Sequence, residues 1–328
     1  MRGTWRQRIV CIWCIAWSCP AYAMMFVPPL EYPKDGYCYV QNYVDVQPES
    51  GGQDCYGLAR SYEKHRGTDF RVSYNAMLDG VHVLAAADGV VVRTRDGMED
   101  TYIISMAKDV NGQECGNGVI LDHGNGWQTQ YCHLKEGSVR VQQGDRVAVG
   151  EPIGAVGLSG KTEFAHVHFQ VTHNGTIVCP FSGEAYMASA EVPDREPLWA
   201  DVREDMLRYT SPQLLRVDYS DFLPDSSRDV LRRPRFTQVL NVGNNPVVFS
   251  VVMAMLNKGD HLVVRLSTLD GVEIAKKVVD VTTFTPQRFD FVGRKDSQNF
   301  VGKTLEGCVE LWRDGTQLVE HRSVVAIR

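Results

Sequence analysis

Clusters of a single charge sign are missing from this chain of 328 residues. Its 34 lysines and arginines are scattered among 40 aspartates and glutamates, which gives a formal net charge of -6. A protein that binds nucleic acid usually gathers basic residues into a patch or stripe that neutralises phosphates. The sequence has no such patch, so we expect no nucleic-acid partner.

Long hydrophobic runs are also scarce, and the one candidate lies at the start. Three arginines within the first eight residues precede an apolar segment from Ile9 to Trp17, and an A-x-A cleavage site follows at 21–23. These features predict a signal peptide over residues 1–23. An uncleaved anchor is the alternative, but polar residues and a proline interrupt the segment before it could span a bilayer. We therefore expect an exported chain, periplasmic or extracellular, with no stable membrane insertion after signal cleavage.

Cysteine is sparse once the predicted signal peptide is set aside. The six that remain are Cys38, Cys55, Cys115, Cys132, Cys179 and Cys308. An even number in an oxidising compartment predicts disulfides. Cys115 and Cys132 flank a predicted hairpin with its turn at 123–126, which would bring them nearly opposite each other on adjacent strands. Buried free thiols are the alternative for this pair.

Strand patterns dominate the chain and predict a mainly β fold. Residues 24–60 are rich in Pro, Tyr, Asp and Gly, and we expect an N-terminal extended arm tied down by Cys38 and Cys55. In residues 61–183, short apolar runs alternate with Gly, Asp and Asn turn signals, as in an all-β domain.

The second half of the chain contains two further segments. Apolar residues spread among charges over 184–215 predict a linker with short helices. Strand patterns return over 216–328, where two Asp-Gly turn signals favour a C-terminal immunoglobulin-like β-sandwich. No cluster of chemistry-bearing residues is evident there, and its protein partner, if it has one, is unknown.

Histidines concentrate in the first β domain, where seven of the nine lie between His65 and His173. One motif among them, H-x-G-x-D, runs from His65 to Asp69. Its glycine disfavours a helix, so we expect the two side chains to converge through a turn that enters a strand. An imidazole and a carboxylate so placed can share one zinc ion, although a surface His near an Asp is common.

A second motif is the H-x-H of His166 and His168, set in an alternating apolar segment that predicts a strand. Alternation places both imidazoles on one face of that strand. They could reach one metal ion or its water, or they could simply lie on a polar sheet face. The spacing alone does not decide which of the two binds metal.

A third candidate is His133, on the second arm of the predicted hairpin. Alternation would place Tyr131 and His133 on the same face. Taken singly, His133 fits a core or edge histidine at least as well as a catalyst.

Taken together, the three motifs favour a catalytic zinc site. Two histidines and one aspartate with an open fourth position suit zinc that activates water. The remaining histidines could transfer protons or polarise the scissile carbonyl.

These segments resemble the lysostaphin-type, LytM-like zinc metalloendopeptidases, a family with an H-x-x-x-D motif followed by an H-x-H motif. The resemblance runs from about Tyr62 to about Phe181 and includes the hairpin segment 119–134 and the glycine-punctuated strands around 144–160. It implies a LytM-like catalytic β-sheet domain. It also implies zinc held by His65, Asp69 and His168, with His133 and His166 acting on the water and the tetrahedral intermediate.

The resemblance and the export signal together predict a zinc-dependent endopeptidase that cuts peptide cross-links in bacterial peptidoglycan. Its substrates would be peptidoglycan stem peptides. Two alternatives remain open: a secreted protease that attacks Gly-rich peptides, and a catalytically silent protein that binds peptidoglycan or activates another hydrolase.

Overall fold

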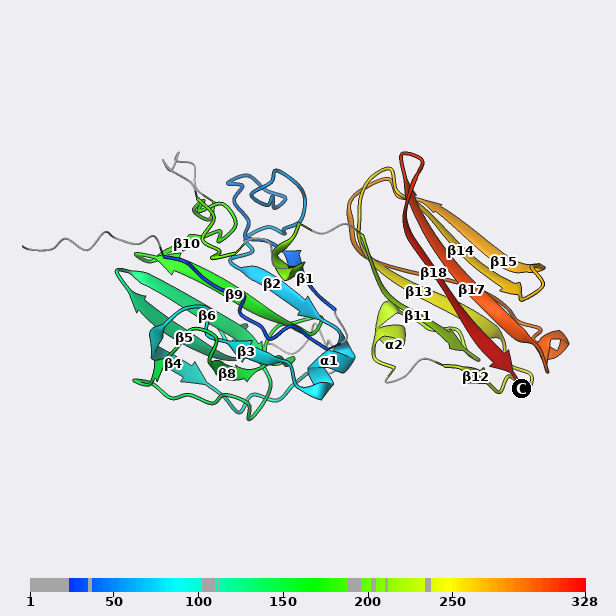
Figure 1. Ribbon diagram of the computed structural model, residues 1–328, viewed down its shortest axis with the longest axis horizontal. Helices are drawn as coiled ribbons and strands as arrows, with labels where there is room; N and C mark the ends of the chain where they lie inside the picture. The colour runs from blue at the N-terminus through cyan, green and yellow to red at the C-terminus, as the bar shows by residue number, and fades with distance from the viewer. Residues whose placement is uncertain are drawn as a thin grey trace, which may run out of the picture.

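The structure is a computed structural model that describes residues 24–34, 37–101, 110, 112–187, 196–201, 205–209, 212–233 and 237–328. The predicted signal peptide, residues 1–23, lies outside the described residues. Two β-rich units stand next to each other in Figure 1, one built from residues up to about 209 and the other from residue 213 onward. Each unit has its own apolar core. None of the described helices is long and apolar enough to cross a bilayer.

The N-terminal unit is organised by one antiparallel sheet in the order β1-β2-β9-β6-β5-β4-β7, with β10 also paired to β9. Its strands are β1 (Cys38–Asn42), β2 (Thr68–Val72), β4 (Gly89–Arg95), β5 (Asn117–Gly124), β6 (Trp127–Leu134), β7 (Arg146–Val147), β9 (His166–His173) and β10 (Thr176–Val178). A separate ribbon pairs β3 (His82–Leu84) with β8 (Pro152–Ala155), and the short helix α1 (Tyr74–Asp79) follows β2.

The middle of this sheet carries the candidate site because it joins the motif strands directly. β9 lies between β2 and β6, so the strand with both histidines of the H-x-H motif pairs with the strand that holds Asp69. Apolar residues that alternate with the motif residues, including Phe70, Val167 and Phe169, are fully buried in the core on the opposite face. Burial of that face fixes the register, because a slip by one residue would turn every side chain over.

The segment expected to be an extended arm contributes to the sheet itself. Residues Cys38–Asn42 form the edge strand β1, which pairs antiparallel with β2 and shifts register between Val40 and Asn42. Phe26 and Leu30 are also buried in the core of the N-terminal unit. This strand shows no alternation of apolar and polar residues because four of its five residues are buried.

The segment expected to be a linker packs on the same core. Leu198, Trp199, Met206 and Leu207 are buried there, and residues Asp205–Leu207 form a single 3-10 turn, η1. The backbone of Leu198 accepts a hydrogen bond of 2.7 Å from the amide of Phe26, so the two segments lie side by side. Other residues of this segment, 188–195 and 202–204, lie outside the described residues.

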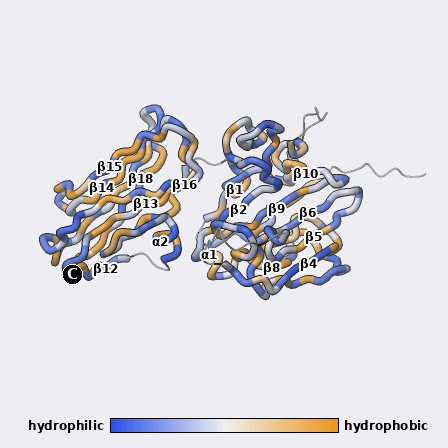
Figure 2. The backbone as a smooth tube through the Cα atoms, turned by 180° about the vertical axis from the view of Figure 1, so that it is seen from behind, coloured by the Kyte–Doolittle hydropathy of each residue, from blue (hydrophilic) through white to orange (hydrophobic). Residues whose placement is uncertain are grey.

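The C-terminal unit consists of two sheets that share one apolar core. One sheet has the order β11-β13-β16 and the other β12-β18-β17-β14-β15. The strands are β11 (Gln213–Ser220), β12 (Val239–Leu240), β13 (Val247–Leu256), β14 (His261–Thr268), β15 (Glu273–Asp280), β16 (Thr285–Arg294), β17 (Thr304–Arg313) and β18 (Thr316–Ile327), with the helical turns α2 (Ser227–Leu231) and η2 (Gln298–Phe300). In Figure 2 the hydrophobic stretches follow the strands of both units. Two sheets around one core suit a sandwich, and its immunoglobulin-like character stays a prediction.

The two units meet through a small apolar cluster. Tyr39 of β1 packs with Ala254 and Met255 of β13, and Tyr37 and Leu215 lie against them. The guanidinium of Arg232 lies 5.6 Å from the ring centroid of Tyr74 across the same junction. Next to this cluster the units enclose a pocket of about 420 Å³.

Candidate metal centre

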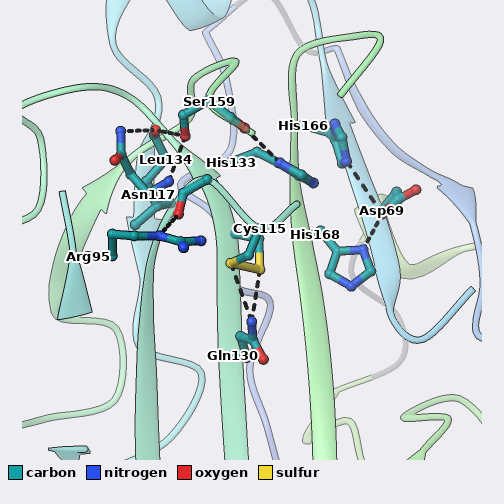
Figure 3. Close-up of a disulfide and its surroundings, with 12 residues drawn as sticks. Asp69, Arg95, Cys115, Asn117, Gln130, His133, Leu134, Ser159, His166 and His168 are labelled. Atoms are coloured by element: carbon teal, nitrogen blue, oxygen red, sulfur yellow. Dashed lines mark hydrogen bonds and ion pairs between the residues drawn. A yellow bond between two sulfur atoms is a disulfide. The ribbon is translucent and has the colours of Figure 1, made fainter. Parts of the chain in front are cut away.

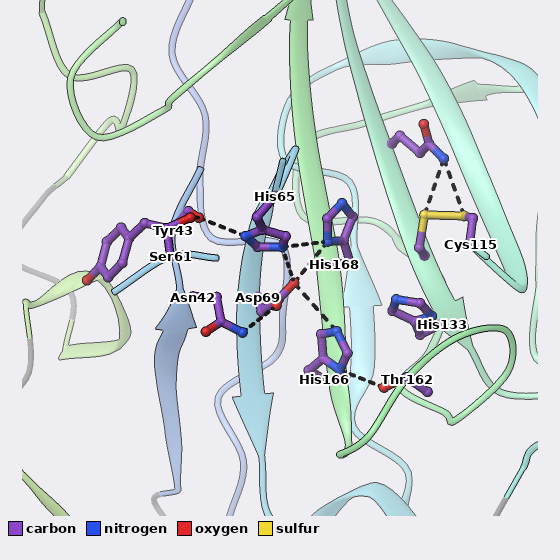
Figure 4. Close-up of polar contacts among 12 residues, drawn as sticks. Asn42, Tyr43, Ser61, His65, Asp69, Cys115, His133, Thr162, His166 and His168 are labelled. Carbon is purple, nitrogen blue, oxygen red and sulfur yellow. Dashed lines mark hydrogen bonds and ion pairs between the residues drawn. A yellow bond between two sulfur atoms is a disulfide. The ribbon is translucent and has the colours of Figure 1, made fainter. Parts of the chain in front are cut away.

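Three side chains converge on one point between β2, β9 and the loop that leads into β2. Nε2 of His65 lies 3.1 Å from Oδ1 of Asp69 and 3.2 Å from Nδ1 of His168, and the last two atoms are 2.9 Å apart. Figure 4 shows all three side chains pointing toward one another. The H-x-G-x-D motif therefore does converge through a turn, and β9 brings His168 to it from a position 99 residues further along the chain.

The spacing of these three atoms fits a zinc ion. Zinc bonds of roughly 2.0–2.2 Å in a tetrahedral site place the ligand atoms about 3.4 Å from one another. The observed separations of 2.9 to 3.2 Å are close to that value. Two imidazoles and one carboxylate also match the ligand types that catalytic zinc prefers.

Hydrogen bonds outside the triad fix the orientation of its members. Nδ1 of His65 donates to the carbonyl of Tyr43 at 2.7 Å, which leaves the lone pair on Nε2 directed at the centre. Asn42 donates from its amide to Oδ2 of Asp69 at 2.8 Å, so Oδ1 is the oxygen left to face the histidines. Such partners are a regular feature of metal sites because they set the tautomer and the angle of each ligand. Sequence reasoning missed both residues because they lie on or next to β1, which it read as an arm.

Burial and charge act in opposite directions on Asp69, which is 3% exposed. Burial would raise its pKa, but the neighbouring His65 and His166 outweigh burial and hold the pKa well below its usual value. For His65, burial would lower the pKa, and the Asp69 carboxylate outweighs that effect and raises it. The carboxylate is therefore ionised and available as a ligand at neutral pH.

His166 lies beside the three converging side chains. Its Nε2 is 3.5 Å from Oδ1 of Asp69, and its Nδ1 donates to the carbonyl of Phe164 at 2.8 Å. Of the two histidines in the H-x-H motif, the one with the shorter contacts to both His65 and Asp69 is His168. Both point to the same side of β9, as the alternation predicted.

His133 reaches the same site from β6. Its ring centroid lies 4.7 Å from that of His166 and 6.1 Å from that of His168. Its Nδ1 donates to the carbonyl of Ser159 at 2.9 Å, so Nε2 carries the free lone pair (Figure 3). Burial, together with the neighbouring His166 and His168, holds the pKa of His133 well below its usual value. The imidazole is therefore neutral at pH 7 and able to accept a proton.

The prediction that Tyr131 and His133 share a face is wrong. Tyr131 points into the core, where its hydroxyl accepts a hydrogen bond from the Ala86 amide and its ring packs on Phe169. His133 turns to the opposite side because its φ is +63° and because β6 gains a residue against β5 near its end. A bulge of this kind re-aims one side chain, which simple alternation cannot predict.

The cysteine pair expected from the hairpin lies at the edge of the site. The Sγ atoms of Cys115 and Cys132 are 2.13 Å apart, at the distance of a disulfide, and the amide of Gln130 lies within 3.3 Å of both (Figure 3). Cys132 precedes the bulged His133, whose backbone amide donates to the carbonyl of Cys115 at 2.8 Å. A covalent link here would hold the backbone from which the bulge starts.

The metal centre opens into a cleft of about 950 Å³. All five candidate site residues line it, together with both cysteines of the close pair and Tyr62. A cleft of this size can hold several residues of an extended peptide.

The C-terminal unit holds a second group of possible ligands that sequence reasoning did not find. Cys308, Glu310 and Glu320 come within 4.8 Å of one another on β17 and β18. Arg265 lies 3.5 Å from the Glu310 carboxylate, and Arg322 lies 2.9 Å from that of Glu320. The two carboxylates are thus part of an ion-pair network on the sheet, which explains their proximity.

Comparison with known proteins finds a family match that covers the candidate site residues. Residues 63–180 match the model of peptidase family M23. Over 132 residues the chain is 34% identical to the peptidoglycan DD-endopeptidase ShyA of Vibrio cholerae, which covers 40% of this chain and 25% of the relative. It is 32% identical over 131 residues to the DD-carboxypeptidase/endopeptidase Mpg of Neisseria meningitidis, with the same coverage.

The matches cover only part of each protein. The chain spans about a quarter of the length of these curated relatives. A solved zinc-containing peptidase from Vibrio cholerae aligns with a TM-score of 0.31 and 22% identity over 49% of this chain and 40% of that one. All five candidate site residues therefore lie within residues 63–180, the segment that matches peptidase family M23.

Proposed function

We propose that this chain is an exported zinc-dependent endopeptidase that hydrolyses the peptide cross-links of bacterial peptidoglycan. The observation that carries the proposal is the convergence of His65 Nε2, Asp69 Oδ1 and His168 Nδ1 within 3.2 Å of one another. Relatives named as peptidoglycan DD-endopeptidases support the choice of substrate.

We assign the metal to these three side chains. Zinc bound there would lower the pKa of a water molecule and polarise the scissile carbonyl. Asn42 and the Tyr43 carbonyl hold the carboxylate and the first imidazole in position for that role. The deep burial of Asp69 and His65 excludes bulk water from the ligands and strengthens their electrostatic interactions.

We assign proton transfer to His133. Its Nε2 lone pair faces the site, and its lowered pKa keeps it unprotonated at neutral pH, so it can take a proton from the attacking water. The same nitrogen can then deliver that proton to the leaving amine.

We assign stabilisation of the tetrahedral intermediate to His166. Its Nδ1 donates to the Phe164 carbonyl, and its Nε2 lies 3.5 Å from Oδ1 of Asp69 at the edge of the metal site. An imidazole held there is placed to interact with the oxygen on which negative charge develops.

Digestion of purified sacculi tests the proposal. The zinc-loaded chain should release soluble fragments, and mass spectrometry of those fragments identifies the bond that is cut. His168→Ala should release none. Zinc-loaded protein that binds sacculi without releasing fragments would instead indicate a catalytically silent binding or activator protein.

A further inference from the structure

Arg71 extends the metal site along β2. It follows Asp69 by two residues, so the two side chains project from the same face of the strand. Arg71 is also paired in register with His166 of β9, as Asp69 is with His168. The guanidinium therefore belongs to the face that carries the site, about 7 Å along the strand, which is the length of two residues of an extended peptide.

This arginine is buried among neutral groups. It is 4% exposed, its Nη1 donates to Oε1 of Gln41, and its guanidinium lies 4.7 Å from the ring centroid of Phe164. The Tyr39 hydroxyl is a further partner. Among the described residues no carboxylate lies within 4.0 Å of it, unlike the buried Arg216, which pairs with Asp218 at 3.4 Å. A buried charge is costly unless a charge of opposite sign offsets it.

Arg71 lines the pocket of about 420 Å³ between the two units. Arg216, Arg228 and Arg232 of the C-terminal unit also line that pocket, and the acidic residue among the lining is the exposed Glu163. The lining is therefore strongly basic in a chain whose net charge is -6.

This basic pocket is continuous with the metal cleft. Gln41, Glu163 and Phe164 line both cavities. Phe164 also connects them through its ring, whose centroid lies 4.4 Å from that of His166 and 4.7 Å from the Arg71 guanidinium. A peptide lying along β2 and β9 at the metal centre would run directly into this pocket.

We propose that Arg71 binds a carboxylate group of the substrate peptide, about two residues from the scissile bond, with the arginines of the C-terminal unit forming the outer wall of the subsite. The inference rests on the proposed peptidase function and specifies which substrates it accepts. Guanidinium and carboxylate groups match in geometry and can form two parallel hydrogen bonds. The subsite selects peptides that keep a free carboxylate at this position over those in which it is an amide.

The test uses one peptide in two chemical forms. Cross-linked peptide fragments released from sacculi are prepared as the free acid and with their carboxylates converted to amides. Binding of both is measured by calorimetry on zinc-loaded, full-length His133→Ala protein, with and without Arg71→Met. Arg93→Met is the matched control, because Arg93 is an exposed arginine on β4 that lines neither cavity.

A charge-assisted hydrogen-bonded pair predicts that Arg71→Met weakens binding of the free acid about 10- to 100-fold. Amidation should weaken binding to the Arg71-containing protein by a similar factor. The two changes together should cost little more than either alone, because each removes the same interaction. In a chain that keeps His133, Arg71→Met should raise KM for the free-acid peptide and leave kcat within a few-fold of its original value. Arg93→Met should leave both forms unaffected.

Other outcomes overturn the proposal. If Arg71→Met weakens binding of the free acid and of the amide equally, Arg71 only holds Gln41 and Phe164 in position and does not bind a carboxylate. If inorganic phosphate binds through Arg71 while amidation of the peptide has no effect, the pocket holds a free anion and is not a peptide subsite. If Arg71→Met does not fold, the comparison of free acid and amide on the protein with Arg71 still decides. Hydrolysis of sacculi with no sensitivity to amidation would reject the subsite and leave the peptidase proposal standing.

Discussion

Gly67 lies directly against the imidazole of His168. A Cβ atom at Gly67 would be 2.6 Å from Nε2 of His168 and 2.8 Å from the carbonyl oxygen of Phe169. The backbone of β9 cannot move away without breaking its pairing with β2, so the ring of the proposed metal ligand would have to tilt. The glycine in the H-x-G-x-D motif is thus needed for space, because its backbone does not adopt the positive φ that favours glycine.

We expect Gly67→Ala to weaken zinc binding about 10- to 100-fold, as changes that misorient a metal ligand typically do. Competition with a chelator measures the affinity. Arg66→Ala, at the exposed neighbouring position, is the control and should bind zinc as the unmodified chain does. If Gly67→Ala binds zinc with unchanged affinity, the present orientation of the His168 ring is not required for metal binding.

Removal of a proposed ligand should remove the metal. The purified chain should carry about one zinc per molecule, as one three-ligand site requires. His65→Ala, Asp69→Ala and His168→Ala should each lose it, because two remaining protein ligands hold zinc weakly. Elemental analysis of the folded variants measures the content. Stoichiometric zinc in His65→Ala and Asp69→Ala would refute the ligand assignment.

Loss of His133 should separate rate from metal binding. His133→Ala keeps all three proposed ligands, so zinc content and melting temperature should stay near those of the unmodified chain. The rate should fall by about 10² to 10⁴, the usual effect of losing a positioned acid or base. If His133 is only a structural residue of the bulge, the variant will instead melt at a lower temperature, and its folded fraction will remain active.

The cysteines of the exported chain should be oxidised in pairs. Peptide mapping without reduction should recover a bridge between Cys115 and Cys132, the pair that flanks the hairpin of β5 and β6. We expect a second bridge between Cys55 and Cys179, because their thiols are in contact and the thiol of Cys179 is the main cause of the raised pKa of Cys55. Formation requires a thiol–disulfide oxidant of the export compartment. Complete alkylation of native, unreduced protein at Cys115 and Cys132 would reject the first bridge, and alkylation at the other pair would reject the second.

The C-terminal unit should be dispensable for the chemical step. All five candidate site residues precede Phe181, while Leu215 already belongs to β11, so a chain that ends after Tyr209 removes that unit without cutting a strand. This shortened chain should keep its zinc and its kcat on soluble peptide. Its KM should rise because it lacks three arginines of the basic pocket. A folded, zinc-loaded short chain without activity would contradict this division.

Local patterns in the sequence predicted that the motif side chains lie close together, which the structure confirms. The spacing of His65 and Asp69, and of His166 and His168, is short, and one turn and one strand determine the direction of each side chain. Alternating buried residues such as Phe70 and Val167 then set which face of β2 and β9 turns to the core, and so which face carries the motif residues. The mainly β class followed from the same alternation.

The parts that were missed depend on contacts between distant segments. The direction of His133 is set by a positive φ in a bulge. Asn42 reaches Asp69 through the pairing of β1 with β2, and the sequence did not reveal this strand because four of its five residues are buried and show no alternation. The basic pocket around Arg71 takes residues from both units, and no spacing along the chain brings Arg71 and Arg232 together.

The position of β1 limits how the proposed peptidase activity could be controlled by cleavage of the chain. Many proteases are held as zymogens by an N-terminal segment that is later cut away. Here the segment before the metal motif forms the edge strand and orients two proposed ligands: Asn42 donates a hydrogen bond to Asp69, and the Tyr43 carbonyl accepts one from His65. A maturation cut after residue 43 would therefore inactivate the protein, and any activating cut has to fall before Cys38.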